Sequence, residues 1–125
     1  MDRRFVALGS AMAFLGIALG AFGTHVLKDR ISTSGIEIWK TGVQYHLIHA
    51  IGLVLVGILA GNLPAKSIKT VGWLMFSGIV IFSGSLYALA VTDVKILGAI
   101  TPLGGLCFLA SWATLVASAT KSSDH

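Results

Sequence analysis

The sequence predicts an all-α fold, a polytopic membrane protein that forms a bundle of four transmembrane helices. Nine Lys and Arg and five Asp and Glu are the only charged residues among 125, and 55% of the chain is hydrophobic. Four stretches contain no charge: residues 5–27, 41–65, 70–92 and 96–120. Because roughly 20 apolar residues cross a ~30 Å hydrocarbon core, each stretch is long enough to span a bilayer. A soluble domain carries about 25% charged residues, against 11% here.

The first helix is expected over residues 5–27. Arg3 and Arg4 before an apolar run resemble the start of a signal peptide, but the run exceeds the roughly 7 to 15 residues of a signal-peptide core. We therefore expect it to remain as a transmembrane helix. Small residues recur along it every three or four positions and so share one face, along which another helix can approach closely. They are Gly9, Ala13, Gly16, Gly20 and Gly23.

The second helix is expected over residues 35–62, because Ser34 followed three residues later by Glu37 fits a capping box. Trp39 is expected as an anchor at the membrane interface. The third helix is expected over residues 70–92 and the fourth over 96–120. Pro102 lies inside the fourth stretch, where it either kinks the helix or begins it with Thr101 as the N-cap. We expect a single integral membrane domain, residues 1–125.

Four spans place both termini on the same side of the membrane. Arg3 and Arg4 flank the first helix, and positive residues there favour the cytoplasm. We therefore expect both termini to be cytoplasmic, with the lipid bilayer as the surrounding partner. His125 is expected to be a solvated terminus.

Two other classes of protein are excluded by composition. The net charge of +4 comes from Lys and Arg residues spread over short segments, which form no basic stripe, so nucleic-acid binding is not expected. The single cysteine, Cys107, provides no disulfide framework or CxxC motif and is expected to be a small core residue.

Polar residues of the uncharged stretches are expected to gather in the outer leaflet, whereas Trp112 is expected in the cytoplasmic half. His46 and His49 are three residues apart, on one face of the second helix, at a depth that Tyr87 can share. Ionisable residues in a span usually face the bundle interior and mark a functional site. The predicted polar pocket consists of His25, Gln44, Tyr45, His46, His49, Tyr87 and Thr101.

Three interpretations of this pocket are open. Its side chains are either structural, joining helices by hydrogen bonds, or they form a binding or permeation site for a small solute, a proton or a lipid head group. The third interpretation is a metal or haem site, for which His25, His46 and His49 are the candidate ligands. No cofactor is predicted, and no enzyme activity is expected, because no nucleophile can be placed with a base and an orienting carboxylate.

A different class of function is an accessory protein whose small-residue faces pack against another membrane complex. This hypothesis predicts that the glycine groove of the first helix stays open. Intramolecular packing is the main use expected for the same small residues, and a homo-oligomer that uses one of these faces is the alternative. The helix-packing positions are Gly9, Gly16, Gly20, Gly23, Gly84, Gly104 and Gly105.

Four ordered motifs resemble the YgdD/YwdK family of small bacterial membrane proteins, a domain-of-unknown-function family. The motifs are GAFGTH at 20–25, IWKTGVQYHLIHA at 38–50, GSLY at 84–87 and LGAITPLGG at 97–105. The resemblance covers nearly the whole chain. It implies a helical membrane fold in the bacterial inner membrane and no established activity. The motifs coincide with the predicted polar pocket, which favours a shared site over incidental hydrogen bonds.

Overall fold

The structure is a computed structural model that describes residues 1–121, so His125 lies outside the described residues. Four helical units are long and apolar enough to cross a membrane: Arg3–Asp29, Thr33–Leu59, Ala65–Thr92 and Leu97–Lys121. The described chain contains helices and turns and no β-strand. The prediction of an all-α, four-helix membrane protein is therefore confirmed.

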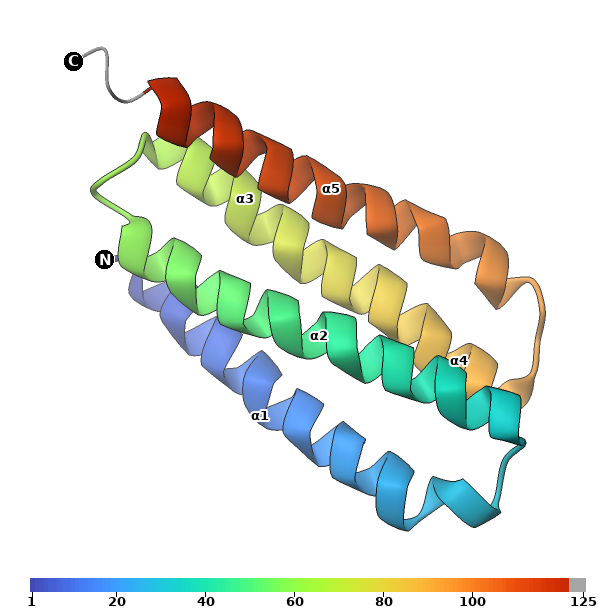
Figure 1. Cartoon of the computed structure of the whole chain (residues 1–125). Helices are drawn as coiled ribbons and strands as arrows, with labels where there is room; N and C mark the ends of the chain where they lie inside the picture. The colour runs from blue at the N-terminus through green and yellow to red at the C-terminus, as the bar shows by residue number, and fades with distance from the viewer. Residues whose placement is uncertain (122–125) are drawn as a thin grey trace.

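The helices run antiparallel in chain order (Figure 1). The elements are α1 (Arg3–His25), the 3-10 turn η1 (Leu27–Asp29), α2 (Thr33–Leu59), α3 (Ala65–Gly78), the π-helical segment η2 (Ile79–Ser83), α4 (Gly84–Thr92) and α5 (Leu97–Lys121). α1 packs chiefly on α2, and α5 packs on α3, η2 and α4. We call the end with the α1–α2 and α4–α5 connections the loop end, and the opposite end the terminal end.

The second helix begins earlier than expected because a different serine caps it. Ser32 is the N-cap, and its Oγ accepts a 3.0 Å hydrogen bond from Gly35 N. Ser34 lies within the first turn, so the expected capping box with Glu37 is wrong. The helix ends at Leu59 rather than at residue 62, since the backbone leaves the helical path at Ala60, whose ψ is 132°, and Gly61 then turns the chain with a φ of +97°.

The third unit begins at Ala65, directly after Pro64, instead of at residue 70. Its first turns include Lys66 and Lys69, whose long side chains can reach water from a helix end. The unit is interrupted by the π-helical segment η2, which the sequence pattern did not predict. In α5, Pro102 lies inside the helix, so Thr101 is not the N-cap and the interior-proline alternative holds.

The glycine-rich face of α1 is filled by α2. A Cβ added at Gly9 would lie 2.7 Å from the Ala50 carbonyl oxygen, and one at Gly23 would lie 2.5 Å from the Trp39 ring. Two further positions of this face also lie against α2: Gly16 and Gly20. These small residues therefore serve intramolecular packing, and the accessory-protein hypothesis, which required an open groove, loses this surface.

The glycines of the other helices differ in their packing. A Cβ at Gly104 would lie 2.7 Å from Phe82 Cα, so α5 approaches the backbone of η2 closely there. Gly105 has ordinary room, because a Cβ added there would lie 3.8 Å from the Phe82 ring. Gly84 was expected to pack against another helix, which is wrong, because a Cβ there would meet no atom within 4 Å.

Candidate functional site

His46 lies at the middle of the bundle. It is the central residue of α2, and it faces Gly16, the central residue of the uncharged stretch 5–27. A Cβ at Gly16 would lie 3.1 Å from Cδ2 of His46. Because α2 begins eight residues before the uncharged stretch at residue 41, His46 is at the centre of the helix rather than near its start.

Both ring nitrogens of His46 are hydrogen-bonded, although the side chain is only 2% exposed. Nε2 lies 2.8 Å from the Met12 carbonyl oxygen of α1, and Nδ1 lies 2.8 Å from the Tyr87 hydroxyl of α4. A carbonyl can only accept, so Nε2 carries the proton and Nδ1 of the neutral ring accepts from Tyr87. This imidazole therefore joins three helices.

His49 is satisfied by a different set of partners. Its Nδ1 donates to the Tyr45 carbonyl oxygen at 2.8 Å, and its Nε2 accepts from the indole Nε1 of Trp112 at 2.9 Å. The ring also stacks on Phe108, with centroids 3.5 Å apart. Trp112 and His49, which were expected in opposite halves of the bundle, are therefore in direct contact.

The two histidines do not form one cluster. His46 contacts α1 and α4, whereas His49 contacts α5, so they belong to separate networks despite their spacing of three residues. His25 is exposed at the end of α1, and no hydrogen bond, ion pair or ring contact in residues 1–121 involves its side chain. The expected convergence of the three imidazoles is therefore wrong.

The three candidate metal ligands are likewise not brought together. Across the described part of the chain, no three His, Cys, Asp or Glu side chains are grouped as a metal site requires. The four ring nitrogens of His46 and His49 all have protein partners. The geometry therefore does not fit a three-histidine metal or haem site, and no chemistry is derived from one.

The other residues of the predicted pocket are dispersed. Tyr87 reaches His46, whereas Thr101 lies on α5 and shares a 2.6 Å hydrogen bond with Ser85. Gln44 and Tyr45 are exposed on α2. The structure thus brings together His46 and Tyr87 by a side-chain hydrogen bond, and His49 and Tyr45 by a bond to the Tyr45 carbonyl and by ring stacking, and it places the other three predicted residues apart from both pairs.

Trp39 and Trp112 make contacts that sequence reasoning did not predict. Trp39, expected as an interfacial anchor, is 6% exposed and donates from Nε1 to the Leu19 carbonyl oxygen at 2.9 Å. Gly23 leaves the space that this ring occupies. The sequence signal for this contact was a glycine near the end of one helix and a tryptophan near the start of the next, at positions where the two helices can lie side by side.

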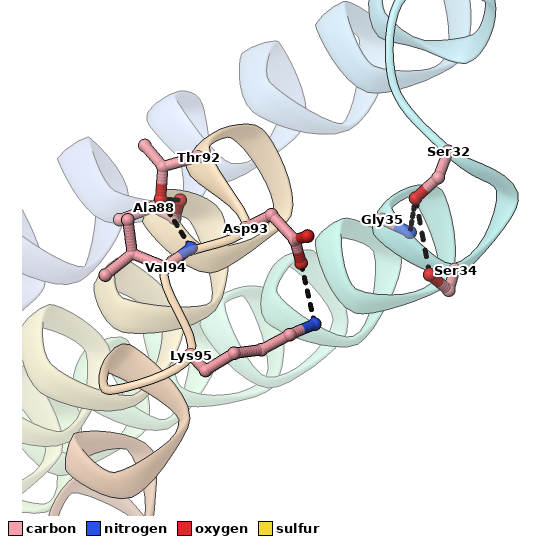
Figure 2. Close-up of polar contacts among 8 residues, drawn as sticks. All are labelled: Ser32, Ser34, Gly35, Ala88, Thr92, Asp93, Val94 and Lys95. Carbon is pink, nitrogen blue, oxygen red and sulfur yellow. Dashed lines mark hydrogen bonds and ion pairs between the residues drawn. The ribbon is translucent and has the colours of Figure 1, made fainter.

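Two hollows lie along α2, the first beside α4 and the second beside η2 and α5. The first, which we call the loop pocket, has a volume of about 260 Å³ at the loop end. It is lined by Arg30, Ile31, Ser32, Ser34, Gly35, Ile38, Leu89, Ala90, Val91, Asp93 and Lys95. Figure 2 shows several of its polar residues: Lys95 donates to Asp93 at 2.8 Å, and Ser32 caps α2.

The second hollow, which we call the aromatic groove, has a volume of about 460 Å³ nearer the middle of the bundle. It lies between α2 and α5, and its lining is almost entirely apolar or aromatic. Its residues are Tyr45, Ile48, His49, Phe82, Gly105, Phe108, Leu109 and Trp112. His49 thus forms part of a groove wall while both of its nitrogens are bound within the protein.

Comparison with known proteins places the chain in a family. The model of a family described as protein of unknown function (DUF423) matches residues 19–105. The chain belongs to this family. It is 53% identical to the UPF0382 membrane protein YwdK of Bacillus subtilis over 94% of this chain and 96% of that protein. It is 44% identical to a UPF0382 membrane protein of Staphylococcus epidermidis, over 94% and 95%. No solved structure matches the chain.

The DUF423 match covers the whole loop pocket but only part of the aromatic groove. The loop-pocket residues all fall within residues 19–105, whereas Phe108 and Trp112 lie beyond them. Met12, which binds His46, precedes the matched segment. The relatives are named membrane proteins, in agreement with four apolar spans. A multi-pass membrane location is therefore established for this DUF423 chain.

Proposed function

We propose that the protein binds an anionic lipid, with the head group in the loop pocket and an acyl chain in the aromatic groove. The supporting observation is that both hollows are lined by one face of α2 and by the unit that η2 and α4 form. Ile38 on α2 and Leu89 on α4 line the loop pocket, and Tyr45 on α2 and Phe82 in η2 line the aromatic groove. On α2 the two residues are seven positions apart, which is two turns and about 10 Å along one face.

The charges of the loop pocket favour an anionic head group. Arg30 and Lys95 line it, and Asp93 is the one carboxylate among its described residues. Asp93 pairs with Lys95, whereas Arg30 forms no ion pair within residues 1–121. The Ser32 and Ser34 hydroxyls add hydrogen-bonding groups. A phosphate group offers several acceptor oxygens to such a set of donors.

The aromatic groove suits a hydrocarbon chain rather than a polar solute. Phe82, Phe108 and Leu109 present apolar surface. The imidazole of His49 has no nitrogen left to bind a ligand, and the Tyr45 hydroxyl is the one other polar side-chain group of the described groove lining that can form a strong hydrogen bond to a ligand. Among the expected ligands, a lipid is therefore favoured over a small solute or a proton, which would require more polar groups at this depth.

Lipid titration of the purified protein in nanodiscs tests this proposal. Phosphatidylglycerol is expected to bind more tightly than phosphatidylcholine, and Arg30→Gln is expected to weaken phosphatidylglycerol binding about fivefold, the effect of one basic residue at a membrane surface. Lys28→Gln is the matched control, because it removes the same charge from the same loop but does not line the pocket. If both variants weaken phosphatidylglycerol binding equally, the loss of affinity comes from general surface charge rather than from the loop pocket, which would contradict the proposal.

A second pair of variants tests the acyl-chain part. Gly105→Leu places a side chain in the aromatic groove and is expected to lower lipid affinity at least tenfold. Gly84→Leu is its control, because Gly84 does not line that groove and has open space around it. If Gly105→Leu has unchanged lipid affinity and a normal thermal unfolding profile, the acyl chain of the lipid does not lie in the aromatic groove.

Orientation in the bacterial inner membrane stays a prediction, with both termini proposed in the cytoplasm. In a Cys107→Ser background, Lys28→Cys in the α1–α2 connection is expected to react with a membrane-impermeant thiol reagent added to intact cells. Lys66→Cys, near the start of α3 at the terminal end, is expected to be protected until the membrane is permeabilised. The reverse pattern would place the loop pocket in the cytoplasmic leaflet.

A further inference from the structure

The side-chain amide of Gln44 has no partner within the described chain. Gln44 is exposed on α2, and no hydrogen bond in residues 1–121 involves its amide. It lies two residues from His46, about 3 Å along the helix axis from mid-depth. Each membrane interface is roughly 15 Å from mid-depth, too far for this side chain to reach water. An amide facing lipid at this depth is unfavourable unless another polar group binds it.

Gln44 belongs to an exposed stripe on α2. The stripe consists of Gln44, Ile48, Ile51, Leu55 and Ile58, spaced by four, three, four and three residues, so the side chains lie along one helix face. Each of the four aliphatic members is about half exposed. Ile48 also borders the aromatic groove, while the other members lie outside it. The stripe thus presents branched side chains and a single hydrogen-bonding group.

We infer that a second copy of this chain docks on this stripe, so that the protein forms a twofold dimer joined by two Gln44 side chains. A carboxamide carries both donors and an acceptor, so two copies related by a twofold axis satisfy each other. No charged residue occurs in residues 41–65, so two identical stripes bring no like charges together. A single polar residue within an apolar helix seam is a known means of fixing register.

Association in lipid bilayers tests the dimer. The full chain, labelled with donor or acceptor fluorophores, is reconstituted at decreasing protein-to-lipid ratios, and energy transfer reports the dimer fraction. The wild type is expected to be dimeric at high ratios, and Gln44→Leu is expected to raise the dissociation constant about tenfold, the effect of losing two interhelical hydrogen bonds. Gln44→Asn, which keeps a carboxamide, is expected to retain most of the association.

Disulfide trapping gives a second readout that does not depend on the amide itself. In a Cys107→Ser background, Gln44→Cys is expected to form a cross-linked dimer on mild oxidation. Leu106→Cys, which is exposed on α5, is the matched control and is expected to stay monomeric. A wild type that is monomeric at every ratio, or Gln44→Leu that associates like the wild type, would overturn the inference. Preferential cross-linking through Leu106→Cys would do the same, because it places the contact on another face. None of these outcomes depends on lipid specificity.

Discussion

The indole Nε1 of Trp112 donates a 2.9 Å hydrogen bond to Nε2 of His49 and so joins the middle of α5 to the middle of α2. The backbone of α5 packs mainly on α3, η2 and α4. This bond therefore connects α5 to α2 through side chains that line the aromatic groove. It also determines the proton position on His49, since the indole can only donate.

Replacing Trp112 with Phe is expected to destabilise the protein. The variant keeps an aromatic ring but leaves Nε2 of the buried His49 without a donor, which costs about 1 to 2 kcal/mol in the free energy of unfolding. Reversible unfolding in detergent micelles measures it. Trp73→Phe is the control, because Trp73 is 47% exposed and its indole has no hydrogen bond among the described residues. If both variants are destabilised equally, the hydrogen bond from Trp112 to His49 makes no specific contribution to the free energy of unfolding.

The two buried histidines are expected to hold opposite neutral tautomers. Nε2 carries the proton in His46, because it faces the Met12 carbonyl, and Nδ1 carries it in His49, because it faces the Tyr45 carbonyl. Nitrogen-15 NMR of the imidazoles distinguishes the two forms. Tyr87→Phe removes the donor to His46 and is expected to change only the His46 signals. Identical tautomers for both rings would contradict the assignment.

Gly104 and Gly84 are expected to respond oppositely to alanine. Gly104→Ala forces a methyl group against the Phe82 backbone, which cannot move aside without shifting η2, and is expected to cost about 2 kcal/mol or more, the scale of overpacking a tight core. Gly84→Ala meets no neighbour and is expected to stabilise the helix by about 0.5 to 1 kcal/mol. Thermal unfolding of both variants would settle the comparison, and a stable Gly104→Ala protein would contradict the close approach.

Acid is expected to weaken the cap of α1. A hydrogen bond from the Arg4 side chain to Asp2 is the main cause that lowers the pKa of this carboxyl below its ordinary value. Since the folded pKa is below the unfolded one, the contribution is present above the unfolded pKa and is lost as pH falls through the folded pKa, below about pH 4. The pKa of Asp2, measured by NMR titration, is expected to shift upward in Arg4→Gln. An unchanged midpoint would exclude Arg4 as the cause.

The four spans could be predicted because charge is excluded from the hydrocarbon core, and this constraint is visible in the sequence without any tertiary information. Helix ends were harder to predict from the sequence. Ser32 and Ser34 both offer a capping hydroxyl, and the choice depends on the path of the preceding η1 turn. The early start of α2 in turn places His46 at the centre of the helix, so the position of a helix end decides where this side chain lies in the bundle.

The partners of the polar residues required the structure. Periodicity places His46 and His49 near one another on a helix surface, but whether they share a site depends on where α1, α4 and α5 lie around α2. The π-helical segment η2 had no recognisable sequence signal, although it presents Phe82 to the close approach of Gly104. The resemblance to a family gave the fold and the membrane location and could not supply a ligand.

The filling of the α1 glycine face by α2 has a consequence for biosynthesis. Tight contacts at Gly9 and Gly23, the Trp39 bond to Leu19 and the His46 bond to Met12 all join the first two helices. These helices are neighbours in the chain, with a short connection. The amino-terminal hairpin therefore has its own set of contacts while the carboxyl-terminal half is still being translated, and the order in which the ribosome delivers the helices matches the order in which they can assemble.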